Sequence, residues 1–313
     1  MDNKALISII VPIYNEAENI PRFFVDLTVV LDDLGERYNW EIIFVNDGSV
    51  DDSSTELQKF TDSRVRVLEF SRNFGKEAAL SAGLQTAKGD AALMIDADFQ
   101  HPLSLIPEFV KKWENGAEVT VGIRKRSKAN LLKRFGSFLF YKIIRRIANV
   151  DIVPNETDFR ILDREVIDAF NALTERNRMT RGLIDWLGFK REYIDFEANV
   201  RVDGHAGYGL LKLFRLAING FVSLSLLPLK LAGYLGALIV FTVGPFGLYV
   251  LLGRYLFNWA YPASFSGPAQ LALLITFLVG IVLCSLGLVA LYVANIHDEI
   301  LARPLYVVRK KRS

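Results

Sequence analysis

Residues 7–16 read ISIIVPIYNE, a β-branched apolar run that ends in polar residues. Apolar runs at 41–46 and 91–95 end in the same way, and amphipathic stretches separate them. Each run has the length and composition of a buried strand, and each stretch has the apolar spacing of a helix. Strands that alternate with helices predict an α/β fold, in which a Rossmann-like, mainly parallel sheet carries helices on both faces.

The same pattern extends through the first 122 residues of the chain. Strands and helices are distinguished by their periods of about 2 and 3.6 residues. The expected strands are 6–11, 41–46, 65–70, 91–95 and 118–122, and the expected helices are 17–34, 52–60, 76–87 and 105–114.

Polar clusters follow these strands where each one ends. The carboxyl ends of parallel strands meet at one edge of the sheet, where ligands of such folds bind, so the clusters predict a single site. No GxGxxG and no GxxxxGK[ST] string occurs there, so a dinucleotide or P-loop site is not indicated. The clusters are Tyr14 to Glu16, Asp47 to Ser49, Arg72 to Lys76 and Asp96 to Asp98.

The cluster at 96–98 predicts a divalent cation site. Asp96 and Asp98 stand two residues apart in a turn, and Gln100 adds a neutral oxygen. Such oxygen sets bind Mg²⁺ or Mn²⁺ together with substrate phosphates. Acidic residues of a solvated loop are the alternative interpretation.

Two further clusters predict contacts with a nucleotide. Asp47 can accept hydrogen bonds from a base or ribose, and Gly48 permits close approach of the backbone. An Asx-turn is the alternative for Asp47. Arg72 and Lys76 lie at a helix start, which suits an anionic diphosphate or a sugar hydroxyl. Ordinary surface charges are the alternative for these two.

The composition indicates a second, membrane-embedded part. The chain has 313 residues, 51% of them hydrophobic, and a mean hydropathy of +0.24. Residues 231–253 and 269–296 carry no charge and are long enough to span a bilayer. One cysteine and three histidines exclude a disulfide framework and make a zinc site improbable.

The distribution of basic residues predicts the topology. Basic residues border the first span and follow the second, whereas the loop 254–268 holds a single arginine and no acid. The positive-inside rule then places both termini and the N-terminal domain in the cytoplasm of a multi-pass protein of the inner (plasma) membrane. The predicted domains are 1–229, and 230–313 with a basic cytoplasmic tail.

Two stretches are predicted to lie on the anionic membrane surface. Residues 119–150 carry only basic charges, with apolar residues at helical spacing between them. This pattern favours an interfacial helix near 130–150, and an apolar-rich stretch at 210–227 favours another. A helix packed on its own domain is the alternative, and no nucleic-acid partner is expected.

Several strings together resemble a known family along almost the whole chain. It comprises the family 2 glycosyltransferases that load a sugar onto a polyprenyl phosphate, the dolichol-phosphate mannose synthase type. The resemblance is closest to the bacterial bactoprenol glucosyltransferases, which have two C-terminal membrane helices. The strings are VPIYNE, VNDGS, SRNFGKEAALSAG, DADFQHP, NETDFRILDR and ARPLYVV.

The resemblance implies a GT-A fold and a set of site residues. The donor would be a nucleotide sugar, with UDP-glucose favoured, and Mg²⁺ or Mn²⁺ the cofactor. Asp158 matches the aspartate proposed as catalytic base, and Arg201 matches an arginine that holds the acceptor phosphate. The residues expected around the nucleotide are Pro12, Tyr14, Glu16 and Asp47, and those expected at the metal are Asp96, Asp98 and Gln100.

The implied reaction is an inverting transfer of a hexose to undecaprenyl or another polyprenyl phosphate, for use in cell-envelope glycosylation. The acceptor phosphate is already ionised near neutral pH, so Asp158 is expected to orient a substrate more than to remove a proton. An ion pair with Arg160 or Arg164 is the alternative role of Asp158. A homo-oligomer, such as a tetramer, and a flippase partner are further expectations.

The sequence departs from the family pattern at two places. His101 follows the glutamine where the family usually has aspartate, and it is expected to be a solvated loop residue and not a ligand. Ala206-Gly207 replaces the usual Ser/Thr-Lys near the acceptor arginine. Arg124 and Arg126 of the basic stretch, or Lys212, are candidates to supply the missing cation.

Two other functions compete with this one. A processive polysaccharide synthase would need a Gln-x-x-Arg-Trp string and more spans, and the stretch RGLIDWLG around Trp186 lacks that string. A catalytically weakened membrane scaffold for a flippase or a second transferase is supported only by the missing Ser/Thr-Lys.

Overall fold

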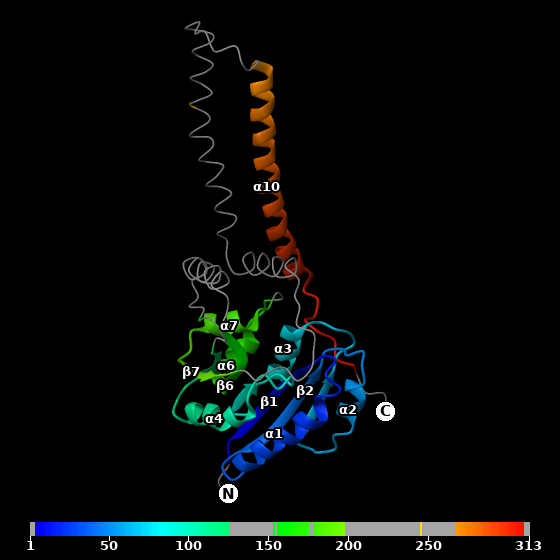
Figure 1. Ribbon diagram of the computed structural model, residues 1–313, viewed down its shortest axis with the longest axis vertical. Helices are drawn as coiled ribbons and strands as arrows, with labels where there is room; N and C mark the ends of the chain where they lie inside the picture. Colours follow the sequence, from blue (N-terminus) through cyan, green and yellow to red (C-terminus); the bar gives the residue numbers. More distant parts are fainter. Residues whose placement is uncertain are drawn as a thin grey trace. The chain divides into compact units, whose positions relative to one another are not determined.

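The computed structural model describes residues 4–125, 153, 155–175, 178–197, 245 and 267–309 (Figure 1). The chain divides into two compact units. Unit 1 contains Met1–Ala206 together with Arg303–Ser313, and unit 2 contains Gly207–Ala302. The sequence interpretation grouped the tail with the membrane domain, whereas it belongs to unit 1.

Strands and helices alternate along unit 1 much as the sequence pattern predicts. The elements from β6 to β7 were not among the expected elements, whereas a helix was expected in the region of α10. In chain order the elements are β1 (Leu6–Ile13), α1 (Ile20–Leu34), β2 (Asn39–Asn46), α2 (Ser53–Gln58), β3 (Val65–Glu69), α3 (Lys76–Thr86), β4 (Ala91–Met94), the 3₁₀ turn η1 (Leu103–Leu105), α4 (Ile106–Glu114), β5 (Val119–Arg124), β6 (Glu156–Asp163), α6 (Arg164–Ala172), α7 (Thr180–Leu187), β7 (Arg191–Phe196) and, in unit 2, α10 (Gly267–Leu301).

The strands form one mixed sheet of order β3-β2-β1-β4-β6-β5-β7. β3, β2, β1 and β4 are parallel neighbours, as expected. β6 lies antiparallel between β4 and β5, and β7 runs parallel to β5. The sheet is therefore mainly parallel, as predicted, with β6 as the one described strand that runs in the opposite direction. Because of this direction, β6 carries its first residues toward the polar strand ends.

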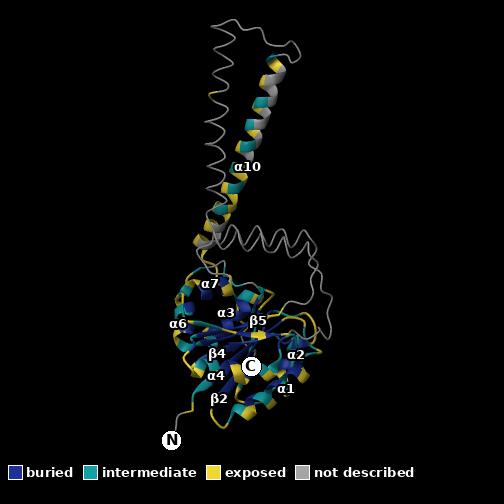
Figure 2. Ribbon diagram, turned by 60° about the vertical axis from the view of Figure 1, so that its left-hand side comes forward, coloured by how far each residue is buried: buried dark blue, intermediate teal, exposed yellow. Residues whose placement is uncertain are grey.

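Successive residues of the central strands face opposite sides of the sheet, and each side is covered by helices. Ile9 and Val11 pack with α1 and α4 in one buried cluster. Ile10 packs with α3, α6 and α7 in a second cluster. The strands are consequently buried on both faces, and Figure 2 shows them in dark blue. A sheet fixed in this way holds its strand ends in place, which is what a site at that edge requires.

Several sequence predictions lie wholly or partly outside the described residues. The interfacial helices near 130–150 and 210–227 are among them, and within the predicted span 231–253 only Pro245 is described. The predicted span 269–296 falls within α10. Among the described residues, no helix combines the length and apolar character needed to cross a membrane.

Candidate active site

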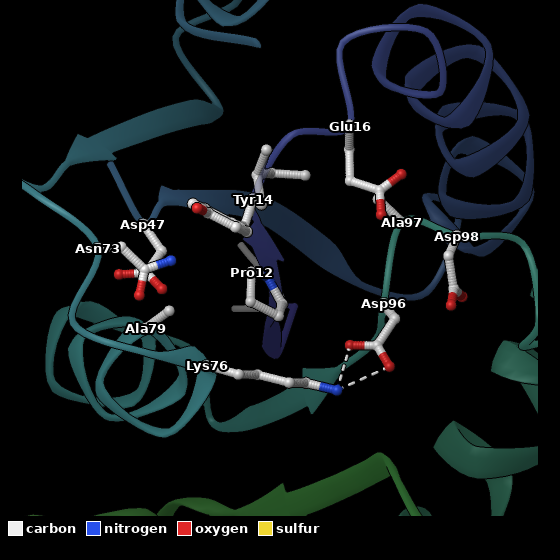
Figure 3. A pocket seen from close by; sticks show the side chains of 11 residues that line it. Pro12, Tyr14, Glu16, Asp47, Asn73, Lys76, Ala79, Asp96, Ala97 and Asp98 are labelled. Atoms are coloured by element: carbon white, nitrogen blue, oxygen red, sulfur yellow. Dashed lines mark hydrogen bonds and ion pairs between the residues drawn. The ribbon is translucent and has the colours of Figure 1, made fainter. Parts of the chain in front are cut away.

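The polar strand ends of β1, β2 and β4 surround one cavity of about 240 Å³, named the Asp47 cavity (Figure 3). The start of α3 closes it. This arrangement brings most of the predicted donor and metal residues together. The lining residues are Pro12, Ile13, Tyr14, Glu16, Asp47, Asn73, Lys76, Ala79, Asp96, Ala97 and Asp98.

Asp47 connects two strand ends. Its carboxylate accepts hydrogen bonds from the backbone N–H of Phe74 at 2.7 Å and of Gly75 at 2.9 Å. Burial raises the pKa of Asp47, and the two N–H donors offset that rise only in part. Asp47 therefore holds the loop between β3 and α3 against the end of β2, in addition to any contact with a ligand.

The turn after β2 allows this close approach because it contains glycine. Gly48 has φ +64°, and a Cβ there would lie 2.2 Å from the carbonyl carbon of Arg72 and 2.6 Å from the nitrogen of Asn73. Only a residue without a side chain fits that backbone and that space. The backbone that approaches Gly48 is that of Arg72 and Asn73, and the predicted approach of Gly48 to a nucleotide stays a prediction.

Asp96, Asp98 and His101 form a group that can hold a metal ion, since one potential ligand atom of each lies within 4.8 Å of the others. Between the two aspartates and His101, Phe99 has a left-handed backbone with φ +58°. This conformation is uncommon for an aromatic residue and turns the chain sharply at the group. The carboxylate pair and the imidazole are a donor set that fits Mg²⁺ or, better, Mn²⁺.

The expectation that His101 is solvated is wrong. His101 is only 7% exposed, and its ring stacks on Phe159 at 5.2 Å. Its Nδ1 lies 3.9 Å from Asp96. Burial lowers the pKa of His101 more than Asp96 raises it, so the ring is neutral near pH 7 and able to donate a lone pair.

A second cavity of about 290 Å³, named the Asp158 cavity, adjoins the first and shares Lys76 and Asp96 with it. Its walls come from the start of β6, the end of β5, α7 and β7. The lining residues are Lys76, Asp96, Gln100, His101, Arg124, Asn155, Glu156, Thr157, Asp158, Arg181 and Phe196.

Asp158 is clamped between two cations. Arg181 Nη2 donates to its Oδ2 at 2.9 Å, and Arg181 Nε donates to Oδ1. Lys76 Nζ lies 2.7 Å from Asp158 and 2.6 Å from Asp96. Burial alone would raise the pKa of Asp158, but the bonds from Arg181 and the charge of Lys76 hold it well below its usual range. Asp158 is therefore ionised at any physiological pH and is a weak proton acceptor.

Arg181 is the residue of the site that the sequence interpretation missed. It stands at the start of α7, and no motif or spacing separates it from the other basic residues of the chain. The ion pairs of Asp158 are made with Arg181 and Lys76, so the alternative in which it pairs with Arg160 or Arg164 is wrong. Arg164 pairs instead with Asp168.

Arg160 belongs to a buried ionic group that includes Glu156 from the wall of the Asp158 cavity. Its guanidinium is fully buried and lies 3.7 Å from Glu156 and 3.9 Å from Asp185. Arg191 also reaches Asp185, at 3.1 Å. Burial, reinforced by the Asp185 charge, raises the pKa of Glu156 to about 7. This group supports the strand that carries Asp158.

The basic residues predicted to contact the donor or the acceptor do not all line the two cavities. Arg72 stacks over the ring of Phe74 at 4.1 Å and is not part of either cavity lining. Arg124 lines the Asp158 cavity, where its guanidinium donates to Gln100 Oε1 at 3.3 Å. Lys76 links Asp96 to Asp158 and lines both cavities, and its contact with a diphosphate stays a prediction. Arg126 and Arg201 lie outside the described residues.

The sequence of the chain is similar to that of known glycosyltransferases. The family described as glycosyl transferase family 2 matches residues 8–170. An uncharacterized glycosyltransferase of Synechocystis sp. is 38% identical, covering 96% of this chain and 94% of its own. The SfII prophage-derived bactoprenol glucosyl transferase of Shigella flexneri is 35% identical, covering 97% of each chain.

One solved structure shows how far the structural likeness extends. Glucosyl-3-phosphoglycerate synthase from Mycobacterium tuberculosis, in complex with Mn²⁺ and UDP-glucose, is 19% identical. The alignment covers 70% of this chain and 78% of that chain, with a TM-score of 0.45. A likeness at this level has no bearing on the substrate or the metal of the present chain.

Proposed function

The chain belongs to glycosyl transferase family 2, and we propose that it transfers a hexose, with glucose favoured, from a nucleotide sugar to a polyprenyl phosphate. The donor would be UDP-glucose and the acceptor undecaprenyl phosphate or a related lipid. The product would be a lipid-linked sugar for cell-envelope glycosylation. Relatives of 34–35% identity over 97% of this chain are named bactoprenol glucosyl transferases or a homolog of one, which supports this choice.

The observation that carries the proposal is the pair of adjoining cavities that share Lys76 and Asp96. The Asp47 cavity offers carboxylates and a helix start, which suit a nucleoside diphosphate held with a metal ion. The Asp158 cavity offers Arg124 and Arg181 beside an ionised carboxylate, which suits an anionic acceptor. A transferase needs such a pair, because donor and acceptor must meet at one carbon atom.

Different side chains would have different roles in the reaction. Asp96 and Asp98 would hold the metal ion, with His101 or Gln100 as a further ligand. When bound, the ion supplies positive charge that stabilises the departing nucleoside diphosphate. Arg181 and Arg124 would orient the phosphate of the acceptor for attack on the anomeric carbon. The nucleotide would lie against Pro12, Tyr14, Glu16 and Asp47, with Arg72 nearby.

Asp158 would act by orientation, because its lowered pKa makes it a poor base and the phosphate nucleophile carries no proton that must be removed. It positions Lys76 and Arg181 and can accept a hydrogen bond from a sugar hydroxyl. Attack from the Asp158 side on a donor held in the Asp47 cavity would be in line with the leaving group. The anomeric configuration would then be inverted.

The acceptor also implies where the protein works. We propose that 231–253 and 269–296 span the inner membrane, with the catalytic domain and both termini in the cytoplasm, because these stretches carry no charge and basic residues flank them. The basic stretch that contains Arg126 would lie on the anionic membrane surface, and Arg201 would hold the acceptor phosphate. We also propose that the protein forms a homo-oligomer and has a flippase as a partner.

The test is a transfer assay with the full-length protein in detergent or membranes. Radiolabelled UDP-glucose and undecaprenyl phosphate should give organic-extractable label that requires Mg²⁺ or Mn²⁺ and disappears with EDTA. UDP-N-acetylglucosamine, UDP-galactose and GDP-mannose serve as competing donors. Asp98→Ala should abolish transfer while retaining the thermal unfolding curve. No label in lipid from any donor would overturn the proposal, and full activity of Asp98→Ala would remove the metal assignment.

A further inference from the structure

The C-terminal tail, residues 303–309, is built into unit 1 as an added piece of strand. Val308 forms an antiparallel bridge with Phe70, directly after the edge strand β3. The N–H of Ser71 donates to Val307 O at 2.9 Å, and the N–H of Arg309 donates to Glu69 O at 2.7 Å. The tail therefore satisfies backbone groups at the point where β3 leads into the loop 71–75.

Side chains of the tail hold the same loop. Tyr306 stacks on Phe70 with ring centroids 4.9 Å apart and planes 10° from parallel, and its hydroxyl donates to Gln85 in α3. Arg309 Nη2 donates to Ser71 O at 3.3 Å. Phe70 is only 1% exposed and belongs to the second buried cluster, against which the partly buried Tyr306 packs.

The stack continues to the Asp47 cavity. Phe70 meets Phe74 edge-on at 5.7 Å, and the N–H of Phe74 donates to Asp47. The loop 71–75 is thus held on one side by Asp47 and on the other by Tyr306 through Phe70. Asn73, in the middle of this loop, lines the cavity together with Asp47.

We infer that the tail is a positioning segment for the nucleotide of the donor, and that Tyr306 is the positioning residue that sets the loop 71–75. This inference rests on the proposed function, in which the Asp47 cavity takes the nucleotide. A loop that is already ordered loses less conformational freedom when a ligand binds, so the tail strengthens donor binding without touching the donor. The tail follows α10 in the chain and lies more than 200 residues after the loop 71–75. Donor binding then depends on a segment that is distant in the sequence from the loop it holds.

The experiment measures nucleotide binding to the full-length protein by calorimetry, with UDP and GDP as probes in the presence of Mn²⁺. Tyr306→Ala should weaken UDP binding about 10-fold, because loop ordering is then a cost of binding. Tyr306→Phe keeps the stack and should stay within about threefold of the wild type. Val307→Ala is the matched control, since this side chain is 46% exposed and contributes through its backbone.

Two further readouts separate a positioning role from a general loss of structure. In Tyr306→Ala, hydrogen exchange should accelerate at the amides of Phe74 and Gly75 while the central strands stay protected. In the transfer assay the KM for the donor should rise while kcat changes by less than about threefold. Unchanged UDP affinity in Tyr306→Ala would overturn the inference alone, whereas a wild-type protein that binds neither UDP nor GDP would overturn the proposed function.

Discussion

Arg181 and Asp158 show how two residues 23 positions apart make one functional group. The guanidinium donates to both carboxylate oxygens, so its removal leaves Lys76 as the cation paired with Asp158 among the described residues. We expect Arg181→Ala to lower kcat about 10- to 100-fold, because the carboxylate loses a fixed partner and the proposed acceptor phosphate would lose one too. Arg181→Lys keeps the positive charge but lacks the two guanidinium N–H donors that contact the carboxylate together, so it should recover part of this loss.

The measurement is steady-state kinetics with the acceptor lipid varied. Arg37→Ala is the matched control, since Arg37 forms an exposed pair with Glu114. The pH profile adds a second readout. Arg181 favours the ionised form of Asp158, so the acidic limb of the profile should move to higher pH in Arg181→Ala. Wild-type kinetics and an unmoved acidic limb in that variant would exclude Arg181 from the site.

Glu156 makes stability depend on pH. Its pKa is about 7 in the folded protein against 4.5 ordinarily, so between these values the folded state keeps a proton that the unfolded chain releases. The contribution of Glu156 to the free energy of unfolding is fully present below about pH 4.5 and is lost as the pH rises through about 7. Glu156→Gln is neutral throughout, so at about pH 8 its free energy of unfolding should exceed that of the wild type by about 1 kcal/mol or more, and its unfolding temperature should be higher.

Thermal unfolding followed by circular dichroism at about pH 5 and about pH 8 checks this prediction. The difference between variant and wild type should be small at the lower pH and should grow toward the higher pH. Glu165→Gln is a suitable control, because Glu165 lies in the first turn of α6, away from the buried ionic group. A constant difference at both pH values would contradict the assignment of the titration to Glu156.

At the scale of elements, the turn after β2 is the tightest junction of the site. Gly48→Ala would place a Cβ 2.2 Å from the Arg72 backbone, in addition to the left-handed φ of +64°. We expect a loss of about 2–4 kcal/mol in the free energy of unfolding and weaker nucleotide binding, because the loop 71–75 must move away from Asp47.

Gly116→Ala separates the two causes. Gly116 also has a left-handed φ, +86°, but a Cβ there meets nothing within 4 Å. Its substitution should cost only the conformational part, about 1 kcal/mol, and should leave nucleotide binding unchanged. Equal losses in denaturant unfolding for the two variants would show that backbone conformation alone, and not the contact with Arg72, determines the cost at Gly48.

At the scale of the whole molecule, the proposed topology can be tested with single cysteines. Cys284 is the only native cysteine, so Cys284→Ser gives a background without thiols. In that background, Ser266→Cys in the loop 254–268 should react with a membrane-impermeant maleimide added to intact cells. Ser313→Cys at the tail should react only after permeabilisation, because the tail is expected on the cytoplasmic side.

The protein should also stay with the membrane in alkaline carbonate. Labelling of Ser313→Cys in intact cells, or release by carbonate, would contradict the proposed topology. A tail paired with Phe70 must also lie on the same side of the membrane as the catalytic domain.

The sequence alone identified the strands and helices from residue 6 to residue 122 and the polar strand ends that form the site. This was possible because hydrophobic period and strand length are local properties, and because parallel strands bring their carboxyl ends together. Asp96, Asp98 and Asp47 could therefore be assigned to one edge of the sheet. The family strings located Asp158, although spacing alone would not have done so.

Only the tertiary structure decided which side chains meet. The antiparallel insertion of β6, the clamp of Arg181 on Asp158, the burial of His101 against Phe159 and the return of the tail to Phe70 have no local signal in the sequence. These contacts arise from packing between distant segments, whose free energy depends on the surfaces that the whole fold brings together. Periodicity determines which face a residue occupies, and only the assembled sheet determines what lies opposite.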